Sequence, residues 1–295
     1  MKAGWYIFQY HNISWEETPY TRGVESTHPP DIFKDHLLHL NRLGEFVSIP
    51  DGLSRLDRHD LTTPMFSFWF DDGLAGVRKY ASPLLEKYNV TGGLSVCSHF
   101  FNRKDLFWRF KLSYLSYIDG LRFLRSRLKK YGYTREMSVK GFCLDNFSEA
   151  IVEEIDAVFK NVTTELERED AFRLFETKTG LMELKEKEWT LANHTAAHYP
   201  VGEDSFVSHF ERQFSECEAE YKTLFGEESR FWVLPFDRGG RRSRRLIERF
   251  RECADSRYLV LVGNKMNTPS HTKEKVIFRI TPPVCKGANL YRSLL

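Results

Sequence analysis

Short apolar segments alternate with amphipathic segments along most of the 295-residue chain. The apolar segments are rich in aromatic and β-branched residues, which is typical of buried strands. We expect strands at 5–10, 46–49, 65–70, 92–98, 189–192, 231–234, 258–262 and 276–280, and helices at 32–43, 77–88, 206–224 and 244–252. A regular alternation of strand and helix predicts a parallel α/β sheet or barrel.

One long region, residues 101–188, interrupts the alternation. Its pattern is mostly helical and contains no clear strand. The chain length allows one large α/β domain or two small ones. We interpret residues 101–188 as a helical insertion between two barrel strands, so that residues 1–295 form a single domain. Within it, the basic amphipathic stretch 106–130 could contact an anionic membrane surface or pack on the barrel.

The overall composition indicates the cellular compartment of the protein but says little about its function. The five cysteines are scattered without a paired motif, which indicates free thiols in a reducing compartment. The N-terminal residues resemble neither a signal peptide nor a membrane anchor, and no apolar run approaches the length of a spanning helix. We therefore expect a cytoplasmic protein, at the inner face of the membrane if the basic stretch binds there. The net charge of +2 gives no reason to expect a nucleic-acid partner.

Two adjacent carboxylates end one of the predicted strands. Asp71 and Asp72 directly follow the segment 65–70 and precede Gly73. Active sites of parallel α/β folds gather at the carboxyl ends of the strands. Adjacent strand residues point in opposite directions, so two carboxylates that act together need a backbone twist, which Gly73 permits. One carboxylate could bind a metal while the other takes a proton, although the same residues also occur in ordinary solvated turns.

Two histidines follow another predicted strand. His194 and His198 come soon after the segment 189–192. Two imidazoles and one carboxylate, here from Asp72, leave coordination positions open for water and substrate in zinc hydrolases and non-haem iron sites. Histidines on such loops can also be simple polar residues, but both motifs lie at predicted strand ends. We therefore expect a divalent metal, with Zn²⁺ the first choice and Co²⁺, Ni²⁺ or Fe²⁺ as alternatives.

These motifs resemble those of the polysaccharide deacetylase family, also called the NodB-homology domain or carbohydrate esterase family four. The family's first motif is a strand ending in (T/S)FDDG, here 68–73, and its second is H(S/T)xxH, here 194–198. The resemblance covers most of the chain outside the insertion and implies a distorted (β/α) barrel. It implies that Asp71 is the catalytic base and that Asp72, His194 and His198 bind the metal.

Two further family motifs are altered in this chain. The third motif usually carries an arginine that orients the base, but Val233 occupies that position. The late histidine that supplies a general acid is also missing. Both departures resemble the exopolysaccharide N-deacetylase branch, in which the acid histidine lies on the first strand. By this resemblance His11 would protonate the leaving amine, although a surface histidine after a strand would look the same.

The expected substrate contacts surround the first and third motifs. A backbone N–H near Pro235 and Phe236 would stabilise the oxyanion. Trp69 could stack on a sugar ring or pack in the core. Arg238 begins a basic run that could bind the phosphate of a lipid-linked or nucleotide-linked sugar, or could simply begin a solvated helix.

We therefore expect a metal-dependent hydrolase that removes an N-acetyl group from an amino sugar. Its substrate would be a sugar, an oligosaccharide or a lipid-linked glycan in surface-polysaccharide biosynthesis. A deformylase or amidase is an alternative, because the metal site does not select the acyl group. A non-catalytic glycan-binding barrel is another, because two motifs are altered, although the retention of both carboxylates and both histidines argues against it.

Overall fold

The central element of the fold is a closed barrel of parallel strands. The computed structural model describes residues 1–24, 26–200, 211–237 and 244–284. The barrel consists of seven strands: β1 (Gly4–Tyr10), β5 (Pro64–Phe70), β6 (Gly93–Val96), β7 (Thr190–Asn193), β8 (Phe231–Val233), β9 (Tyr258–Val262) and β10 (Val276–Ile280). Strand β1 pairs with both β10 and β5, which closes the ring, and the predicted (β/α) barrel is confirmed.

Three short strands lie outside the ring. Strand β4 (Glu45–Phe46) pairs with β5 at the barrel exterior, and β2 (Asn12–Ile13) pairs with β3 (Thr27–His28) beside the end of β1. Helices and helical turns surround the barrel: η1 (Arg22–Val24), α1 (Pro30–Leu40), α2 (Ile49–Asp57), the π-helical turn η2 (Val77–Ala81), α3 (Ser82–Glu86), α10 (Lys178–Glu186), α11 (Glu211–Phe225), α12 (Arg244–Ala254) and α13 (Pro269–Lys273).

Side-chain alternation along the strands divides the barrel into an inside and an outside. Every second residue of β1 and β5 points inward, including Trp5, Ile7 and Trp69, which join one buried cluster. The intervening residues, such as Phe8 and Phe68, pack outward in a second cluster beneath the surrounding helices. At the carboxyl ends of the strands the inward face becomes polar, and the candidate site lies there.

The expected strand at 46–49 is wrong in its second half. Residues Glu45–Phe46 form β4, but Ile49 is already the first residue of α2. The side chain of Ser48 accepts a hydrogen bond from the backbone N–H of Asp51 at 3.2 Å and so caps this helix. Pro50 lies in the first turn, where its missing N–H is not needed. The capping sequence therefore outweighs the apolar run.

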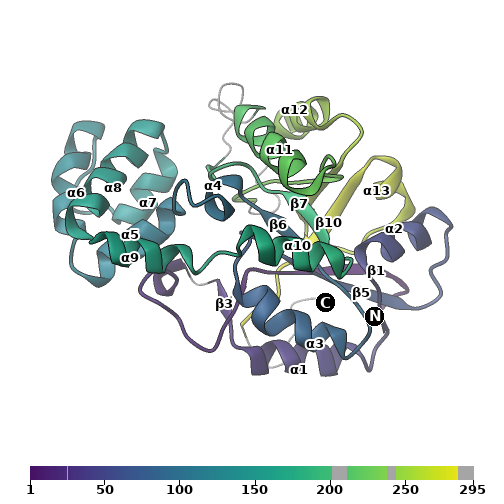
Figure 1. Ribbon diagram of the computed structural model, residues 1–295. Helices are drawn as coiled ribbons and strands as arrows, with labels where there is room; N and C mark the ends of the chain where they lie inside the picture. The colour runs from purple at the N-terminus through teal and green to yellow at the C-terminus, as the bar shows by residue number, and fades with distance from the viewer. Residues whose placement is uncertain (25, 201–210, 238–243, 285–295) are drawn as a thin grey trace.

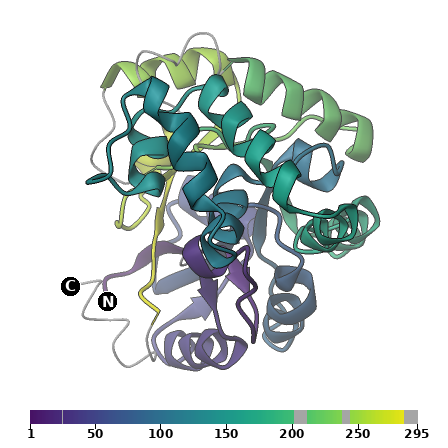
Figure 2. The ribbon, with the colours of Figure 1, turned by 90° about the vertical axis from the view of Figure 1, so that its left-hand side faces the viewer.

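The helical region between β6 and β7 forms a lobe beside the barrel (Figure 1). After α4 (Ser98–Phe101), the lobe contains α5 (Trp108–Tyr117), α6 (Leu121–Leu128), η3 (Lys129–Tyr131), α7 (Val139–Asp145), α8 (Glu149–Val162) and α9 (Glu165–Phe172). Figure 2 views the molecule from the lobe side, with these helices in front of the barrel. The lobe has its own buried cluster, to which Tyr20 and Leu74 from the barrel side also belong.

Cys97, Cys143, Cys217 and Cys253 are all free thiols, as predicted, and Cys285 lies outside the described residues. Within the described ranges, every helix is too short or too polar to cross a membrane.

Candidate metal and catalytic site

The two carboxylates of the first motif are turned toward one pocket by an unusual backbone. Asp72 and Gly73 both adopt positive φ angles, 72° and 69°, directly after β5 ends. A non-glycine residue in this left-handed region is uncommon and often marks a functional turn. Asp71 and Asp72 are each only 2% exposed. The expected backbone twist is therefore present, but it begins at Asp72 itself.

The histidine loop after β7 is held by its own hydrogen bonds. Asn193 accepts a hydrogen bond from the N–H of Thr195 (2.9 Å), and the Thr195 hydroxyl accepts one from the N–H of His198 (3.1 Å). Gln213 of α11 accepts another from the N–H of Ala197 (2.8 Å). Thr195 and His198 also have positive φ angles, 72° and 55°. This compact turn places both imidazoles on the same side of the loop.

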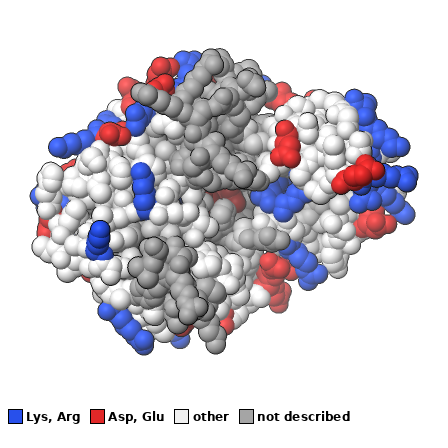
Figure 3. All heavy atoms as spheres, turned by 180° about the vertical axis from the view of Figure 1, so that it is seen from behind, with Lys and Arg blue, Asp and Glu red and all other residues white. Residues whose placement is uncertain are grey.

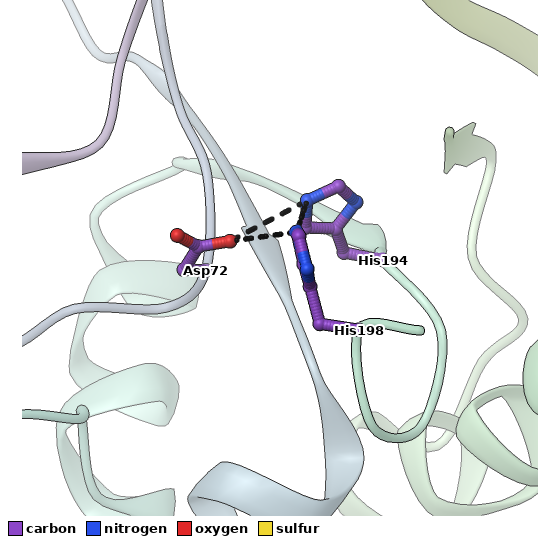
Figure 4. Close-up of side chains that lie close together, drawn as sticks. All are labelled: Asp72, His194 and His198. Carbon is purple, nitrogen blue, oxygen red and sulfur yellow. Dashed lines mark hydrogen bonds and ion pairs between the residues drawn. The ribbon is translucent and has the colours of Figure 1, made fainter. Parts of the chain in front are cut away.

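Three potential metal ligands converge at this point (Figure 4). Asp72 Oδ1 lies 3.1 Å from His198 Nε2 and 3.6 Å from His194 Nε2, and the two Nε2 atoms are 3.1 Å apart. His194 Nδ1 donates to the Val233 carbonyl at 3.0 Å, which leaves the Nε2 lone pair for a metal. Two imidazole nitrogens and one carboxylate oxygen, all buried, are a donor set that fits Zn²⁺.

The pKa shifts of Asp72 and His198 favour the forms that bind a cation, whereas the shift of His194 does not. Burial raises the pKa of Asp72, but the adjacent imidazoles of His198 and His194 outweigh it and hold the pKa well below its usual value. Burial lowers the pKa of His198. Burial would also lower the pKa of His194, but the carboxylates of Asp71 and Asp72 raise it. Metal binding requires an ionised carboxylate and neutral imidazoles, and the shifts of Asp72 and His198 are in that direction.

Asp71 is held by three donors. Arg279 Nη1 (2.6 Å) and the Ser95 hydroxyl (2.5 Å) donate to its Oδ1, and Gln9 Nε2 (2.6 Å) donates to its Oδ2. The side chains of Arg279 and Asp71 are 1% and 3% exposed. Burial raises the pKa of Asp71, but the Arg279 guanidinium outweighs it, and the pKa is lowered to about 2. Asp71 is therefore ionised near neutral pH and fixed in orientation.

Arg279 was not among the residues predicted from the sequence. It lies in β10, on the inward face of the barrel, and its guanidinium donates a hydrogen bond to the Asp71 carboxylate. Val233, at the position where the family usually has an arginine, cannot make this contact. One sequence feature could have identified it, because Arg279 is the only charged residue in the otherwise apolar strand Val276–Ile280. A charged residue is almost never fully buried without a partner, so a buried carboxylate was to be expected nearby.

The carboxylates, the histidines and His11 line one cavity of about 260 Å³. His11 directly follows β1, next to the end of β5, as the strand order requires. Phe107 and Arg109 of the lobe line the same cavity, so the insertion contributes to the site. The ring of Phe107 packs 4.6 Å from that of His198. The five residues predicted to bind metal or transfer protons are therefore brought together, while their roles remain predictions.

Only some of the residues predicted to contact the substrate line this cavity. Phe236 lines the cavity, and its ring lies 4.8 Å from that of His198. Pro235 is buried beside it and is not among the cavity-lining residues. Trp69 is fully buried in the core and so does not take the alternative role of a sugar contact. It points into the barrel, where its ring lies 5.9 Å from the Arg279 guanidinium. Arg238 lies outside the described residues.

Several solved structures share this architecture. Streptococcus pyogenes deacetylase PplD in complex with acetate has a TM-score of 0.60 and 13% identity, over 100% of both chains. A de-N-acetylase from Aggregatibacter actinomycetemcomitans has a TM-score of 0.62 and 14% identity, over 99% of both chains. BC0361, a polysaccharide deacetylase from Bacillus cereus, has a TM-score of 0.57 and 11% identity, over 100% of this chain and 70% of that one.

No protein-family model and no curated protein sequence matches the chain. The similarity is therefore one of structure and extends over the whole chain. The chain has the fold of the polysaccharide deacetylases, as its two sequence motifs predicted.

Proposed function

We propose that the chain is a metal-dependent carbohydrate N-deacetylase, which hydrolyses the N-acetyl group of an amino sugar to acetate and a free amine. The observation that carries this proposal is the convergence of Asp72, His194 and His198 beside the buried carboxylate of Asp71. The structural neighbours support it, because they include a de-N-acetylase and a deacetylase solved with acetate.

Asp72, His194 and His198 would hold the divalent ion. A Zn²⁺ ion bound there would supply Lewis acidity toward an acyl oxygen and lower the pKa of a water molecule, and Co²⁺, Ni²⁺ or Fe²⁺ could do the same. The chain itself fixes the ligands: the Val233 carbonyl orients His194, and the hydrogen bonds of the 193–198 loop orient His198.

Asp71 would accept a proton from the attacking water. Because Arg279 and Ser95 already occupy Oδ1, the Oδ2 atom, which receives one hydrogen bond from Gln9, is the better acceptor. A base of low pKa has a weak affinity for the proton, but it is always in the ionised form. His11, in the same cavity, would return a proton to the departing amine.

The cavity would take one N-acetylated sugar unit of a longer substrate. Its volume of about 260 Å³ is close to the lower limit of small-ligand pockets, about 300 Å³. Phe107 and Phe236 provide an apolar wall beside His198, and a backbone N–H near Phe236 would face the oxyanion. We propose an oligosaccharide or lipid-linked glycan, processed in the cytoplasm during surface-polysaccharide synthesis.

The proposal is tested by following acetate and formate release from N-acetylated and N-formylated amino-sugar oligosaccharides. The wild type is expected to release acetate, and a His198→Ala variant is expected to lose both metal affinity and activity. The metal affinity should fall because one of three protein ligands is gone. Release of formate alone would favour a deformylase. A wild type that retains metal but hydrolyses no N-acyl sugar would refute the proposal.

His11 can be tested separately. A His11→Ala variant should lose about 10²–10⁴-fold in activity, the usual contribution of one general acid or base. Its metal content should be unchanged, because His11 is not among the three converging ligands. A matched control is His59→Ala, which removes an exposed histidine at the end of α2. Full activity of His11→Ala would refute the acid assignment and leave the metal site unaffected.

A further inference from the structure

Four exposed hydrophobic residues belong to one short segment of the helical lobe. We define the tip as residues 117–137, which cover the end of α5, all of α6 and η3, and the loop before α7. Tyr117, Ile118, Phe123 and Met137 are 61%, 37%, 48% and 46% exposed. They are four of the ten large hydrophobic residues exposed among the described residues. Single exposed hydrophobic residues need no explanation, but four in one short segment give it an apolar surface that is available for contact.

The tip is also the most basic part of the lobe. It contains six cationic residues, Arg122, Arg125, Arg127, Lys129, Lys130 and Arg135, against the two acids Asp119 and Glu136. The whole protein has a net charge of only +2, so this charge is concentrated locally. Figure 3 shows Lys and Arg side chains gathered at this outer end of the lobe.

Part of this charge is neutralised by the lobe, and part is not. Glu154 of α8 pairs with Arg127 at 2.8 Å and with Lys130 at 2.6 Å. Within the described ranges, no ion pair involves Arg125, Lys129 or Arg135, and all three are exposed. Helix α6 buries Leu124 and Leu128 against the lobe and turns its cations outward. Arg122 lies 4.8 Å from the Phe123 ring, so cationic and apolar groups are interleaved.

Only part of the basic stretch predicted at 106–130 faces outward. Its first part, α5, is buried inside the lobe, where Lys111 is only 3% exposed. The ammonium group of Lys111 bridges Asp105 at 2.5 Å and Asp156 at 2.6 Å, so its charge is neutralised internally. The outward-facing basic surface therefore begins at Tyr117 and extends past residue 130 to Met137.

From these observations we propose that the tip docks the protein on an anionic lipid bilayer. Cations would contact lipid phosphates while Phe123, Tyr117 and Ile118 enter the interface, the pattern of peripheral membrane surfaces. A polyanion such as a nucleic acid would explain the cations but not the exposed aliphatic and aromatic side chains. The lobe carrying the tip also lines the candidate site through Phe107 and Arg109. Docking would hold that site near a lipid-linked glycan, but the docking itself does not depend on the proposed function.

The proposal is tested by vesicle flotation of the full chain without substrate. The protein should bind vesicles of phosphatidylcholine mixed with phosphatidylglycerol and should not bind vesicles of phosphatidylcholine alone. The triple variant Arg125→Glu, Lys129→Glu, Arg135→Glu should bind at least on the order of a hundredfold more weakly, since each cation near an anionic membrane contributes about fivefold. A control with the same change of charge is Lys34→Glu, Arg42→Glu, Arg58→Glu, at exposed positions near α1 and α2; it should bind like the wild type.

A second variant separates lipid from other polyanions. Phe123→Ser removes an exposed ring without changing charge, so it should weaken vesicle binding several-fold and leave heparin binding unchanged. Unchanged thermal unfolding of each variant would show that the lobe remains folded. Equal binding to both kinds of vesicle, no binding to either, or equal loss in the two triple variants would overturn the proposal. Vesicle binding that Phe123→Ser does not alter would identify a general polyanion site instead.

Discussion

Replacing Asp71 by asparagine is expected to abolish nearly all activity while leaving the metal bound. The carboxylate is the proposed proton acceptor, and losing a general base costs about 10²–10⁴-fold. The amide has the same shape, and its oxygen can still accept the hydrogen bonds of Arg279 and Ser95. Asp72, His194 and His198 are untouched, so metal content should equal that of the wild type. Acetate release and metal analysis on the same preparation measure both effects.

The contrast with Asp72 makes this prediction specific. Asp72→Asn should lower metal affinity, because it replaces a charged ligand by a neutral one. The two variants should therefore lose activity for different reasons. Excess metal should restore part of the activity of Asp72→Asn and none of the activity of Asp71→Asn. If Asp71→Asn retained more than a tenth of the wild-type rate, Asp71 would not be the base.

Replacing Arg279 by methionine should have the largest effect on stability. The variant leaves Asp71 buried without its cation, and breaking one side of a buried ion pair costs roughly 3–5 kcal/mol. The free energy of unfolding, measured in urea, should fall by that amount. Activity should fall as well, because Asp71 would lose the donor that fixes Oδ1 at 2.6 Å.

A double-mutant cycle separates the ion pair from simple packing. In the variant Asp71→Asn, Arg279→Met, the uncompensated carboxylate is gone, so the combined loss of stability should be clearly smaller than the sum of the two single losses. Arg279→Lys keeps the charge and should retain part of the stability. Additive single losses would show that Arg279 acts by filling space, and the role of orienting Asp71 would then be wrong.

The barrel and the metal triad were predictable because their determinants are local. Alternation of apolar strands and amphipathic helices predicted a parallel sheet or barrel, and the family resemblance implied the barrel. The residues directly after β5 and β7 were identified from the ends of those strands. The carboxyl ends of all the parallel strands lie at one end of a barrel, so Asp72, His194 and His198 were expected to converge. Helix α2 was missed because a short apolar run and a capping sequence overlap at residues 46–51.

The contact between Arg279 and Asp71 could not be predicted in the same way. Arg279 is 208 residues away in the sequence, and its contact depends on barrel closure through the pairing of β1 with both β5 and β10. The same alternation that aims Arg279 inward also buries Trp69, which sequence proximity to the motif had suggested as a sugar contact. The motif that contains Asp71 could be identified from the sequence alone. Which side chains face Asp71 is decided by the register of the strands in the barrel.

The most direct test of the central claim is metal reconstitution of the wild type. After chelation the protein should be inactive, and stepwise addition of Zn²⁺ should restore acetate release from an N-acetylated amino-sugar oligosaccharide, with full activity at one bound ion per chain. The His198→Ala variant should show no such titration. Acetate release that survives complete removal of metal, or that is restored equally in His198→Ala, would contradict the account.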